Sequence, residues 1–356
     1  MKIACIAYLH GFGGAEKQII MLANELAERG HDVTLISLCG DEQCYKISDK
    51  VRYIFLPDRK SGILSIASRY IDLMKTLKKI KPDVSVNFWF QPTYLTVLMP
   101  KSITGQVIYS ERGDPGDSEY SGLLGLVRTL TLPFVQGFVF QSKGAADYFG
   151  KSVKKRSVII SNPVNIGDGF ETPSEREKFI ISVGRLAPQK NQKLLIKAFS
   201  LAADRIPEYK LVFYGDGELK EELEKYISEL GLNDRILIHD AIPNVLNEVN
   251  KAALFVLSSD YEGMPNALME AMALGVPSIS TDCKPGGAKA LIRNGVNGII
   301  VPRNNPSKLA DRIVFMLKNP GRANEMGMKA KIISKTHSHK AVYDKWESFL
   351  KSIREK

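Results

Sequence analysis

The sequence predicts an α/β protein with two Rossmann-like, doubly wound domains. A chain of 356 residues is longer than a single hydrophobic core usually holds, so its length indicates about two domains. Short apolar runs alternate with stretches of helical periodicity, a pattern typical of parallel sheets covered by helices on both faces. The alternation stops at residues 161–178, where Pro, Gly, Ser and Asn are frequent. We therefore expect an N-terminal domain at 1–165 and a C-terminal domain at 166–322, facing a central cleft.

The first domain opens with a strand, a helix and a second strand. Residues 2–9 are apolar, and residues 16–29 then carry apolar side chains at helical spacing until Gly30 ends the helix. The strands expected after it lie at 32–37, 52–56, 83–89, 105–110 and 137–141.

The alternation restarts after the linker. Strands are expected at 179–184, 210–215, 235–240, 254–259, 277–281 and 298–302. The helices between them are expected to begin near Asn191, Glu218, Asn244, Pro265 and Pro306. The tail at 323–356 is helical too, and the apolar face of its last helix suits a cap on a domain.

Composition and charge narrow the classes of function. The chain has 49 Lys and Arg against 39 Asp and Glu, a formal net charge of +10, which suits an anionic small molecule, an anionic membrane or a nucleic acid. No nucleic acid is expected, because the basic residues lack interleaved aromatics or a groove-reading helix. No apolar run is long enough for a transmembrane helix, and the start lacks the shape of a signal peptide. None of the four cysteines is in a CxxC pair, so we expect reduced thiols in a cytoplasmic protein.

Glycine-containing loops follow several strands and precede helices. Gly13 and Gly14 let the backbone approach a ligand beside the free N–H groups of the next helix, although a tight turn explains the pair equally well. Gly215 and Asp216 fit either the wall of a ligand site or a simple turn. These loops alone indicate no particular ligand, and the first is not the GxGxxG pattern of a nicotinamide site.

A pair of cations follows the first strand of the second domain. After Gly184, Arg185 and Lys190 are five residues apart, at the end of a strand and the start of a helix. Arginine binds phosphate oxygens through two N–H donors and lysine adds a point charge, so the pair suits one anionic group. The alternative is two solvated cations on a surface loop.

The most specific segment is 258–281. Pro265 suits the first position of a helix, and Gly275 suits its end. Glu262 precedes this helix and Glu270 lies within it, so both carboxylates can face one pocket, where free N-terminal amides would bind a diphosphate or sugar hydroxyls. The alternative is a salt-bridged glutamate in the core.

Together these motifs resemble the family-four retaining glycosyltransferases of the GT-B fold. The match is an ordered series, GGAE, SNPV, GRLAPQKN, GDGEL, EGMPNALMEAMALGVP and GIIVP, and it spans almost the whole chain. It is similar to bacterial transferases that build surface polysaccharides and lipid-linked glycans. The resemblance also implies that the last helix, around Trp346, crosses back to the first domain.

The resemblance implies a role for each matching residue. Arg185 and Lys190 neutralise the diphosphate of a nucleotide-sugar, Glu262 lies near the donor sugar hydroxyls, and these three are the expected catalytic residues. Glu270 binds the ribose. The remaining expected donor-binding residues are Gly13, Gly14, Gly184, Gly215, Asp216, Ile242, Gly263, Met264, Pro265, Asn266, Ala267 and Leu268. The resemblance implies no cofactor and no metal, and this fits a sequence that has no DxD pair placed to hold one.

One departure concerns the first domain. Many relatives carry a histidine after the strand at 105–110, where this chain has Ser110 followed by Glu111, Arg112, Gly113 and Asp114. A base role for that histidine is therefore not carried over. Glu111, Arg112 and Asp114 become the candidates on the acceptor side.

The expected activity is a retaining α-glycosyltransferase. It would move a hexose or N-acetylhexosamine from a UDP-sugar to a glycan acceptor that is carried on a lipid. The alternatives are a sugar-nucleotide 2-epimerase on the same fold and a non-catalytic nucleotide-sugar-binding protein.

A lipid-linked acceptor also predicts peripheral contact with an anionic membrane on its cytoplasmic face. Arg69 with the lysines at 75–81, and the basic run at 151–156, accompany an apolar stretch at 123–130. A buried core helix beside solvated lysines would leave the same pattern.

Overall fold

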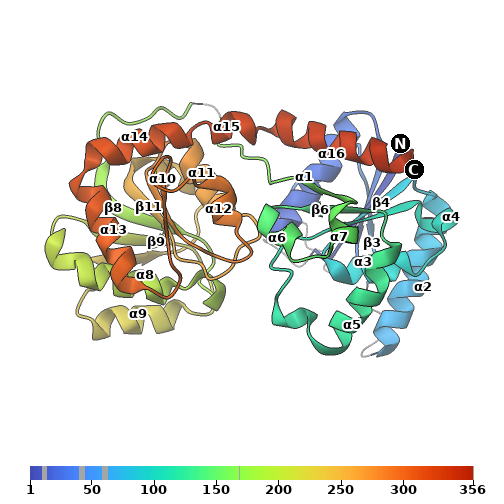
Figure 1. Cartoon of the computed structure of the whole chain (residues 1–356), viewed down its shortest axis with the longest axis horizontal. Helices are drawn as coiled ribbons and strands as arrows, with labels where there is room; N and C mark the ends of the chain where they lie inside the picture. Colours follow the sequence, from blue (N-terminus) through green and yellow to red (C-terminus); the bar gives the residue numbers. More distant parts are fainter. Residues whose placement is uncertain (10–13, 40–44, 58–62, 168, 356) are drawn as a thin grey trace. The chain divides into compact units, whose positions relative to one another are not determined.

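The computed structural model describes residues 1–9, 14–39, 45–57, 63–167 and 169–355 and divides the chain into two compact units (Figure 1). Unit 1 comprises Met1–Asn162 together with Lys340–Lys356, and unit 2 comprises Pro163–His339. Unit 1 thus ends three residues before the predicted boundary. Residues 323–339, predicted to lie outside the second domain, belong to unit 2 because Ala330 and Ile333 are buried in its core.

Unit 1 is built on a parallel sheet with the strand order β3-β2-β1-β4-β5-β6-β7. The strands are β1 (Lys2–Ala7), β2 (Asp32–Ser37), β3 (Arg52–Phe55), β4 (Val84–Phe88), β5 (Gln106–Ser110), β6 (Gly137–Phe140) and β7 (Ser157–Ile159). Each predicted strand of this domain is present. The sequence analysis missed β7, since only three residues pair there at the edge of the sheet, directly after a basic run.

Helices cover both faces of the unit 1 sheet. They are α1 (Gly14–Glu28), α2 (Ile63–Ile80), α3 (Phe90–Val97), α4 (Lys101–Thr104), α5 (Gly122–Thr131), α6 (Lys143–Asp147), α7 (Lys151–Lys154) and α16 (His339–Arg354). The side chains of β1 alternate between the two faces. Ile3 and Cys5 pack in one cluster with α1 and α16, whereas Ala4 and Ile6 pack in another with α2.

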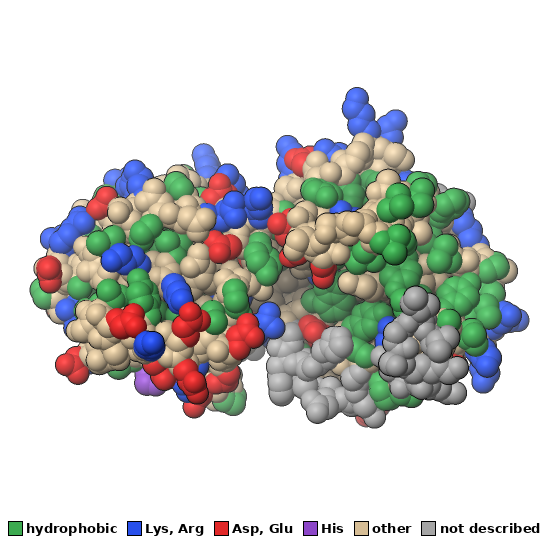
Figure 2. Space-filling view, turned by 90° about the horizontal axis from the view of Figure 1, so that it is seen from below, with side chains coloured by type: hydrophobic (Ala, Val, Ile, Leu, Met, Phe, Trp, Pro, Cys, Tyr) green, Lys and Arg blue, Asp and Glu red, His purple; other side chains and the backbone are tan. Residues whose placement is uncertain are grey.

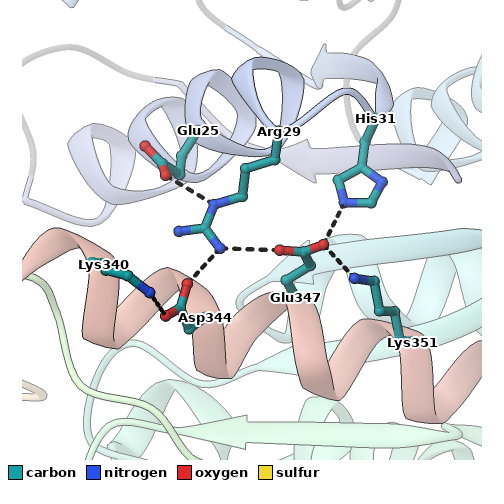
Figure 3. A network of polar contacts seen from close by, with 7 residues as sticks. All are labelled: Glu25, Arg29, His31, Lys340, Asp344, Glu347 and Lys351. Atoms are coloured by element: carbon teal, nitrogen blue, oxygen red, sulfur yellow. Dashed lines mark hydrogen bonds and ion pairs between the residues drawn. The ribbon is translucent and has the colours of Figure 1, made fainter.

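The last helix, α16, packs on unit 1 although the whole of unit 2, Pro163–His339, separates it in sequence from the rest of that unit (Figure 1). Trp346 is buried, and its ring stacks on Phe88 of β4 with 6.3 Å between the ring centroids. Arg29 at the end of α1 joins the two helices, because its Nη1 donates to Asp344 at 2.8 Å and to Glu347 at 3.0 Å (Figure 3). Apolar packing and this ion network together hold α16 in place.

Unit 2 is built on a second parallel sheet, with the strand order β10-β9-β8-β11-β12-β13. The strands are β8 (Glu177–Val183), β9 (Lys210–Tyr214), β10 (Ile236–His239), β11 (Ala252–Leu257), β12 (Ser278–Thr281) and β13 (Ile299–Val301). All six match the predicted ones. Four of them are largely buried, which agrees with a parallel sheet covered on both faces.

The helices of unit 2 form two cores, one on each face of its sheet. They are α8 (Gln192–Ala202), α9 (Lys220–Glu229), α10 (Val245–Lys251), α11 (Asn266–Ala273), α12 (Gly287–Leu291), α13 (Pro306–Lys318), α14 (Pro320–Ala330) and α15 (Ile333–Thr336). The predicted helix starts agree within two residues. Pro265 is the N-cap of α11 rather than its first residue, with φ −77° and ψ 96°.

Each sheet reverses its winding between its first strand and its fourth. The reversal lies between β1 and β4 in unit 1, and between β8 and β11 in unit 2. At such a switch point the loops at the carboxyl ends of the two strands leave in opposite directions, which opens a crevice for a ligand. A ligand site is therefore expected among the residues that follow these four strands. Among the described helices, none has both the length and the apolar character to cross a bilayer.

Candidate functional site

Two loops meet at the switch point of unit 2, one after β8 and one after β11. Asp260 N–H donates to the carbonyl of Gln189 at 2.9 Å, and Ser258 Oγ donates to the carbonyl of Lys190 at 2.8 Å. Asn191, in the left-handed region at φ 46°, caps α8 and donates from its side chain to Asp260 at 3.1 Å. These bonds fix the backbone that carries Arg185 and Lys190 against the backbone that carries Glu262.

Lys190 and Glu262 form an ion pair across the two loops. The distance from Lys190 Nζ to Glu262 Oε1 is 2.5 Å, and the side chains are 22% and 8% exposed. Ser259 Oγ donates to the same carboxylate oxygen at 2.7 Å. A carboxylate this deeply buried depends on its cation and its hydrogen bonds. The salt-bridged buried glutamate is thus Glu262 in the loop, whereas the alternative was raised for Glu270 within the helix, and the partner of Glu262 is the lysine predicted to contact a diphosphate.

Arg185 lies at the surface beside this pair. Its side chain is exposed and makes no ion pair with any residue that the structure describes. It lines a cavity of about 310 Å³ together with Ala187, Pro188, Gln189, Glu218 and Tyr261. An unpaired guanidinium at the rim of a cavity can bind an anionic ligand without first breaking an internal contact.

Gly215 is required by close packing between the loops after β8 and β9. A Cβ built at this position would lie 2.0 Å from the carbonyl oxygen of Gly184, closer than any side chain tolerates. The same loop is bonded to its neighbour, because Asp216 Oδ2 accepts from Ala241 N–H at 3.2 Å. Ile242, one of the expected donor-binding residues, is 40% exposed next to this loop. Close packing of the backbone therefore explains why glycine occupies this loop of unit 2, whether or not a ligand binds there.

The segment before α11 is mostly buried. Gly263, Met264, Pro265 and Leu268 are buried, whereas Asn266, Ala267 and Glu270 are partly exposed. Gly287 packs against this segment, since a Cβ there would lie 2.5 Å from the carbonyl oxygen of Gly263. The structure thus places the predicted donor-binding residues of this segment on one loop and helix after β11.

The three acceptor-side candidates lie after β5 in unit 1. Glu111 is buried, and its carboxylate accepts from the Tyr109 hydroxyl and from the N–H groups of Arg112 and Gly113 at 2.9 and 3.0 Å. Burial raises the pKa of Glu111. Asp114 is partly exposed and accepts from Gly116 N–H at 2.9 Å.

Arg112 is also buried. Its guanidinium lies over the Phe88 ring at 3.9 Å and donates to Asn162 at 3.1 Å, and burial lowers its pKa to about 9. Glu111 and Arg112 therefore brace the interior of unit 1, and their contact with an acceptor stays a prediction. Gly13 lies outside the described residues, and Gly14 is the exposed first residue of α1.

Several functional candidates escaped the sequence analysis. Ser259, Asn191 and Asp260 hold the two loops of unit 2 together, and the signal for them was polar residues directly after a buried strand. Unit 1 also contains a cavity of about 340 Å³, lined by Tyr8, Glu16, Trp89, Gln91 and Glu119. Within the described ranges, no three His, Cys, Asp or Glu side chains group as metal ligands do. The prediction of a metal-independent reaction stays a prediction.

Two family models, both of glycosyltransferases, match consecutive parts of the chain. Residues 12–168 match the family described as Glycosyltransferase Family 4, and residues 168–332 match the family described as Glycosyl transferases group 1. A Campylobacter jejuni protein is 27% identical over 362 residues, covering 99% of each chain, and is named GalNAc-alpha-(1->4)-GalNAc-alpha-(1->3)-diNAcBac-PP-undecaprenol alpha-1,4-N-acetyl-D-galactosaminyltransferase. A second protein of that organism, an N-acetylgalactosamine-N,N'-diacetylbacillosaminyl-diphospho-undecaprenol 4-alpha-N-acetylgalactosaminyltransferase, is 26% identical and covers 94% of this chain and 95% of its own.

Solved structures share the fold at lower identity. The Anabaena protein HepE, in complex with UDP and glucose, superposes with a TM-score of 0.83 at 18% identity, over 99% of this chain and 100% of its own. A lipopolysaccharide outer core galactosyltransferase in its apo form has a TM-score of 0.77 at 20% identity, over 99% of both chains.

Proposed function

The chain belongs to the group 1 and family 4 glycosyltransferases and has the GT-B fold, and from this premise we propose that it transfers a hexose or N-acetylhexosamine from a UDP-sugar to a lipid-linked glycan, with retention of the α configuration. The observation that carries the proposal is the arrangement at the unit 2 switch point. There, the exposed Arg185, which forms no ion pair within the described part of the chain, lines a cavity beside the partly buried pair of Lys190 and Glu262. Cations at this edge of a parallel sheet suit the diphosphate of a nucleotide-sugar.

In the proposed reaction, the bond between the anomeric carbon and the donor diphosphate breaks while the acceptor oxygen bonds to the same face of that carbon. The acceptor hydroxyl passes its proton to the departing phosphate oxygen. Negative charge grows on the diphosphate as the bond breaks, and Arg185 and Lys190 would offset it more strongly in the transition state than in the ground state. Glu262 would hold the Lys190 ammonium in position through their 2.5 Å contact.

The donor and acceptor classes are supported by relatives. The HepE structure contains UDP and glucose, and both Campylobacter relatives are named for undecaprenol-linked glycans. A bacterial polyprenol-linked acceptor would place the reaction in the synthesis of surface polysaccharide or lipid-linked oligosaccharide.

The test is UDP release that depends on an added acceptor. Purified protein is incubated with UDP-glucose, UDP-galactose, UDP-GlcNAc or UDP-GalNAc, with and without a panel of polyprenyl-diphosphate glycans. We expect one donor to give UDP release and a product whose new linkage is α by NMR. EDTA should leave the rate unchanged. A β product, or turnover of no UDP-sugar with any acceptor, contradicts the proposal.

The same assay separates the alternatives. A sugar-nucleotide 2-epimerase would change the sugar configuration with no acceptor and release no UDP during turnover. A binding protein would retain the nucleotide-sugar unchanged. Both outcomes are visible by chromatography of the nucleotide pool.

Membrane contact is part of the proposal and is supported by the outer face of α5. Leu123, Leu126 and Leu130, at helical spacing, are 77%, 55% and 62% exposed, and Phe134 just after the helix is 65% exposed. Figure 2 shows hydrophobic side chains gathered on this side of unit 1. The neighbouring Leu124 and Val127 pack inward instead, so α5 is amphipathic with an apolar side turned to solvent.

Cations border this apolar side. Arg156 Nη1 donates to the carbonyl of Pro133 at 3.0 Å, which brings the basic run at 151–156 beside the turn that carries Phe134. Lys151 and Lys155 are exposed and make no ion pair with a described residue. Each lysine close to an anionic surface contributes about 1 kcal/mol of attraction.

Flotation with anionic vesicles at low salt tests this contact. We expect the protein to float with vesicles of phosphatidylglycerol and phosphatidylethanolamine, and Leu126→Ser/Leu130→Ser to abolish flotation. Leu201→Ser, at an exposed leucine of α8 in unit 2, is the matched control. Equal flotation of all three proteins, or of none, removes the membrane contact from the proposal.

A further inference from the structure

Each of the two cations at the unit 2 switch point has a backbone carbonyl that accepts a hydrogen bond from a buried polar side chain. Gln192, the first residue of α8, is 4% exposed, and its Nε2 donates to the carbonyl of Arg185 at 2.9 Å. Ser258, which directly follows β11, is also buried and donates from Oγ to the carbonyl of Lys190. The backbone that carries both cations is therefore anchored from the interior of unit 2.

The Gln192 amide has a second polar end that the mechanism does not yet use. Its Oε1 is buried and has no hydrogen-bond partner among the residues that the structure describes. The amide cannot be reversed, because Oε1 would then face the Arg185 carbonyl, which accepts and does not donate. Burial of an amide oxygen costs free energy unless a donor reaches it. The orientation of this oxygen is thus fixed, and it requires a donor.

A small cavity beside the ion pair supplies the place for that donor. Gln192, Lys190, Ser258 and Ser259 are among the residues that line it, and its volume is about 10 Å³, close to the space that one water molecule needs. The Lys190 ammonium has three donors, and Glu262 accepts from one of them at 2.5 Å. The cavity thus brings together an amide oxygen, a cation with further donors and two hydroxyl groups.

The chemistry of this lining suits a water molecule. Water can accept from the Lys190 ammonium, donate to Gln192 Oε1 and donate to a serine hydroxyl, and about three hydrogen bonds are typical of buried water. A metal cation would be repelled by the ammonium, and a small anion would meet the amide oxygen. A cavity of this size also does not hold a phosphate group.

We propose that Gln192 is a positioning residue for the donor diphosphate and acts through both cations. Its Nε2 fixes the backbone of Arg185, and its Oε1 orients the Lys190 ammonium through one water molecule in the cavity. Glu262 and this water then take two of the three ammonium donors, which leaves one for a phosphate oxygen. The inference rests on the proposed function, because that function supplies the diphosphate to which the cations are directed.

Calorimetric titration of the full-length protein with UDP, inorganic pyrophosphate and uridine tests the proposal. Gln192→Met keeps the length of the side chain and removes both polar ends of the amide. The Kd of UDP and that of pyrophosphate should each rise about tenfold, as loss of hydrogen bonds that orient the cations predicts. The Kd of uridine, which has no phosphate, should stay the same. A merely structural role would lower the fraction of folded protein, and with it the binding stoichiometry, and would change none of the three Kd values.

Gln106→Met is the matched control. Gln106 is half-buried at the start of β5 in unit 1, and its Oε1 is likewise buried with no partner in the described structure. The same substitution there should leave the Kd of all three ligands as in the parent protein. Tighter or weaker binding of pyrophosphate by Gln106→Met, equal to that of Gln192→Met, would show that loss of any buried amide has this effect and would overturn the proposal.

Two further measurements test the route through Lys190. In the Lys190→Met background, Gln192→Met should weaken pyrophosphate binding less than it does in the parent protein, because part of its effect passes through the ammonium. A high-resolution crystal structure should show a water molecule within hydrogen-bonding distance of Gln192 Oε1 and Lys190 Nζ. An effect of the same size in both backgrounds, or a cavity without ordered water, would overturn this route.

The outcomes distinguish this inference from the proposed function. If Gln192→Met binds UDP and pyrophosphate as tightly as the parent protein, Gln192 is not a positioning residue, and the proposed function is unaffected. If the parent protein binds pyrophosphate and turns over no UDP-sugar, the proposed function is wrong, and the effect of Gln192→Met on pyrophosphate still decides the inference. A parent protein that binds neither ligand contradicts both.

Discussion

Replacing Lys190 by methionine tests the ion pair at the unit 2 switch point most directly. The substitution keeps much of the side-chain length and removes the ammonium that lies 2.5 Å from Glu262. Glu262, 8% exposed, is then left with Ser259 as its remaining side-chain hydrogen-bond donor in the described structure. Removing one partner of a buried pair costs about 3–5 kcal/mol of stability. We expect about 3 kcal/mol, the lower end, because solvent reaches 22% of the Lys190 side chain.

The chain offers a control with the same geometry and different burial. Lys193 and Glu222 also form a pair at 2.5 Å, but their side chains are 48% and 51% exposed. An exposed pair contributes roughly 0–1 kcal/mol, so Lys193→Met should barely change the free energy of unfolding. The comparison isolates burial, since charge type and distance match.

The double variant Lys190→Met/Glu262→Gln separates stability from catalysis. With no charge left in the buried position, most of the lost stability should return. Acceptor-dependent UDP release should stay roughly 30- to 900-fold below wild type, the equivalent of about 2–4 kcal/mol of transition-state stabilisation. Urea unfolding followed by circular dichroism gives the first quantity and initial rates give the second.

Two results would refute this reasoning. A Lys190→Met variant no less stable than Lys193→Met would mean that burial does not make the pair dependent on both partners. A double variant that regains stability and transferase activity together would mean that the pair serves folding alone.

Three further predictions concern stability. Gly215→Ala should lower the free energy of unfolding by about 1–3 kcal/mol in urea titration, because the new methyl group overlaps the Gly184 carbonyl. Trp346→Ala should cost about 3–5 kcal/mol, since it removes a buried ring stacked on Phe88; a loss below 1 kcal/mol would contradict tight packing of α16. Burial lowers the pKa of His31 below its ordinary 6.5, so at this position the unfolded chain binds more protons than the folded chain below that pH. The free energy of unfolding of the wild-type protein should therefore fall as the pH is lowered from 7 to 5.5, whereas that of His31→Gln should not.

Much of the fold could be predicted because the strands of parallel sheets are short and apolar and are often followed by glycine. The central strands, such as β4 and β11, stand out in sequence because both faces are buried. β7 could not be found this way, since a three-residue strand at a sheet edge carries no periodicity of its own. The strand order is also invisible in the apolar pattern, and it determines which loops meet.

The sequence predicts which residues belong to the candidate site, but it does not predict which of their side chains contact one another. Lys190 and Glu262 were assigned to separate ligand groups, and their ion pair depends on β8 and β11 being neighbours in the sheet. Burial of Glu111 and Arg112 was equally out of reach, because charged residues after a strand are more often exposed than buried. Trp89 gave no signal in sequence, since its unusual feature is a backbone angle.

The return of α16 to unit 1 has a consequence for synthesis on the ribosome. Unit 2 is one continuous segment, Pro163–His339, and it can reach its native structure as soon as that segment has left the exit tunnel. Unit 1 is translated first but lacks the side chains of Val342, Trp346 and Leu350 that complete its interior. The half that emerges earliest therefore finishes folding last, and a nascent chain would expose the surface around Phe88 to chaperones until its final helix arrives.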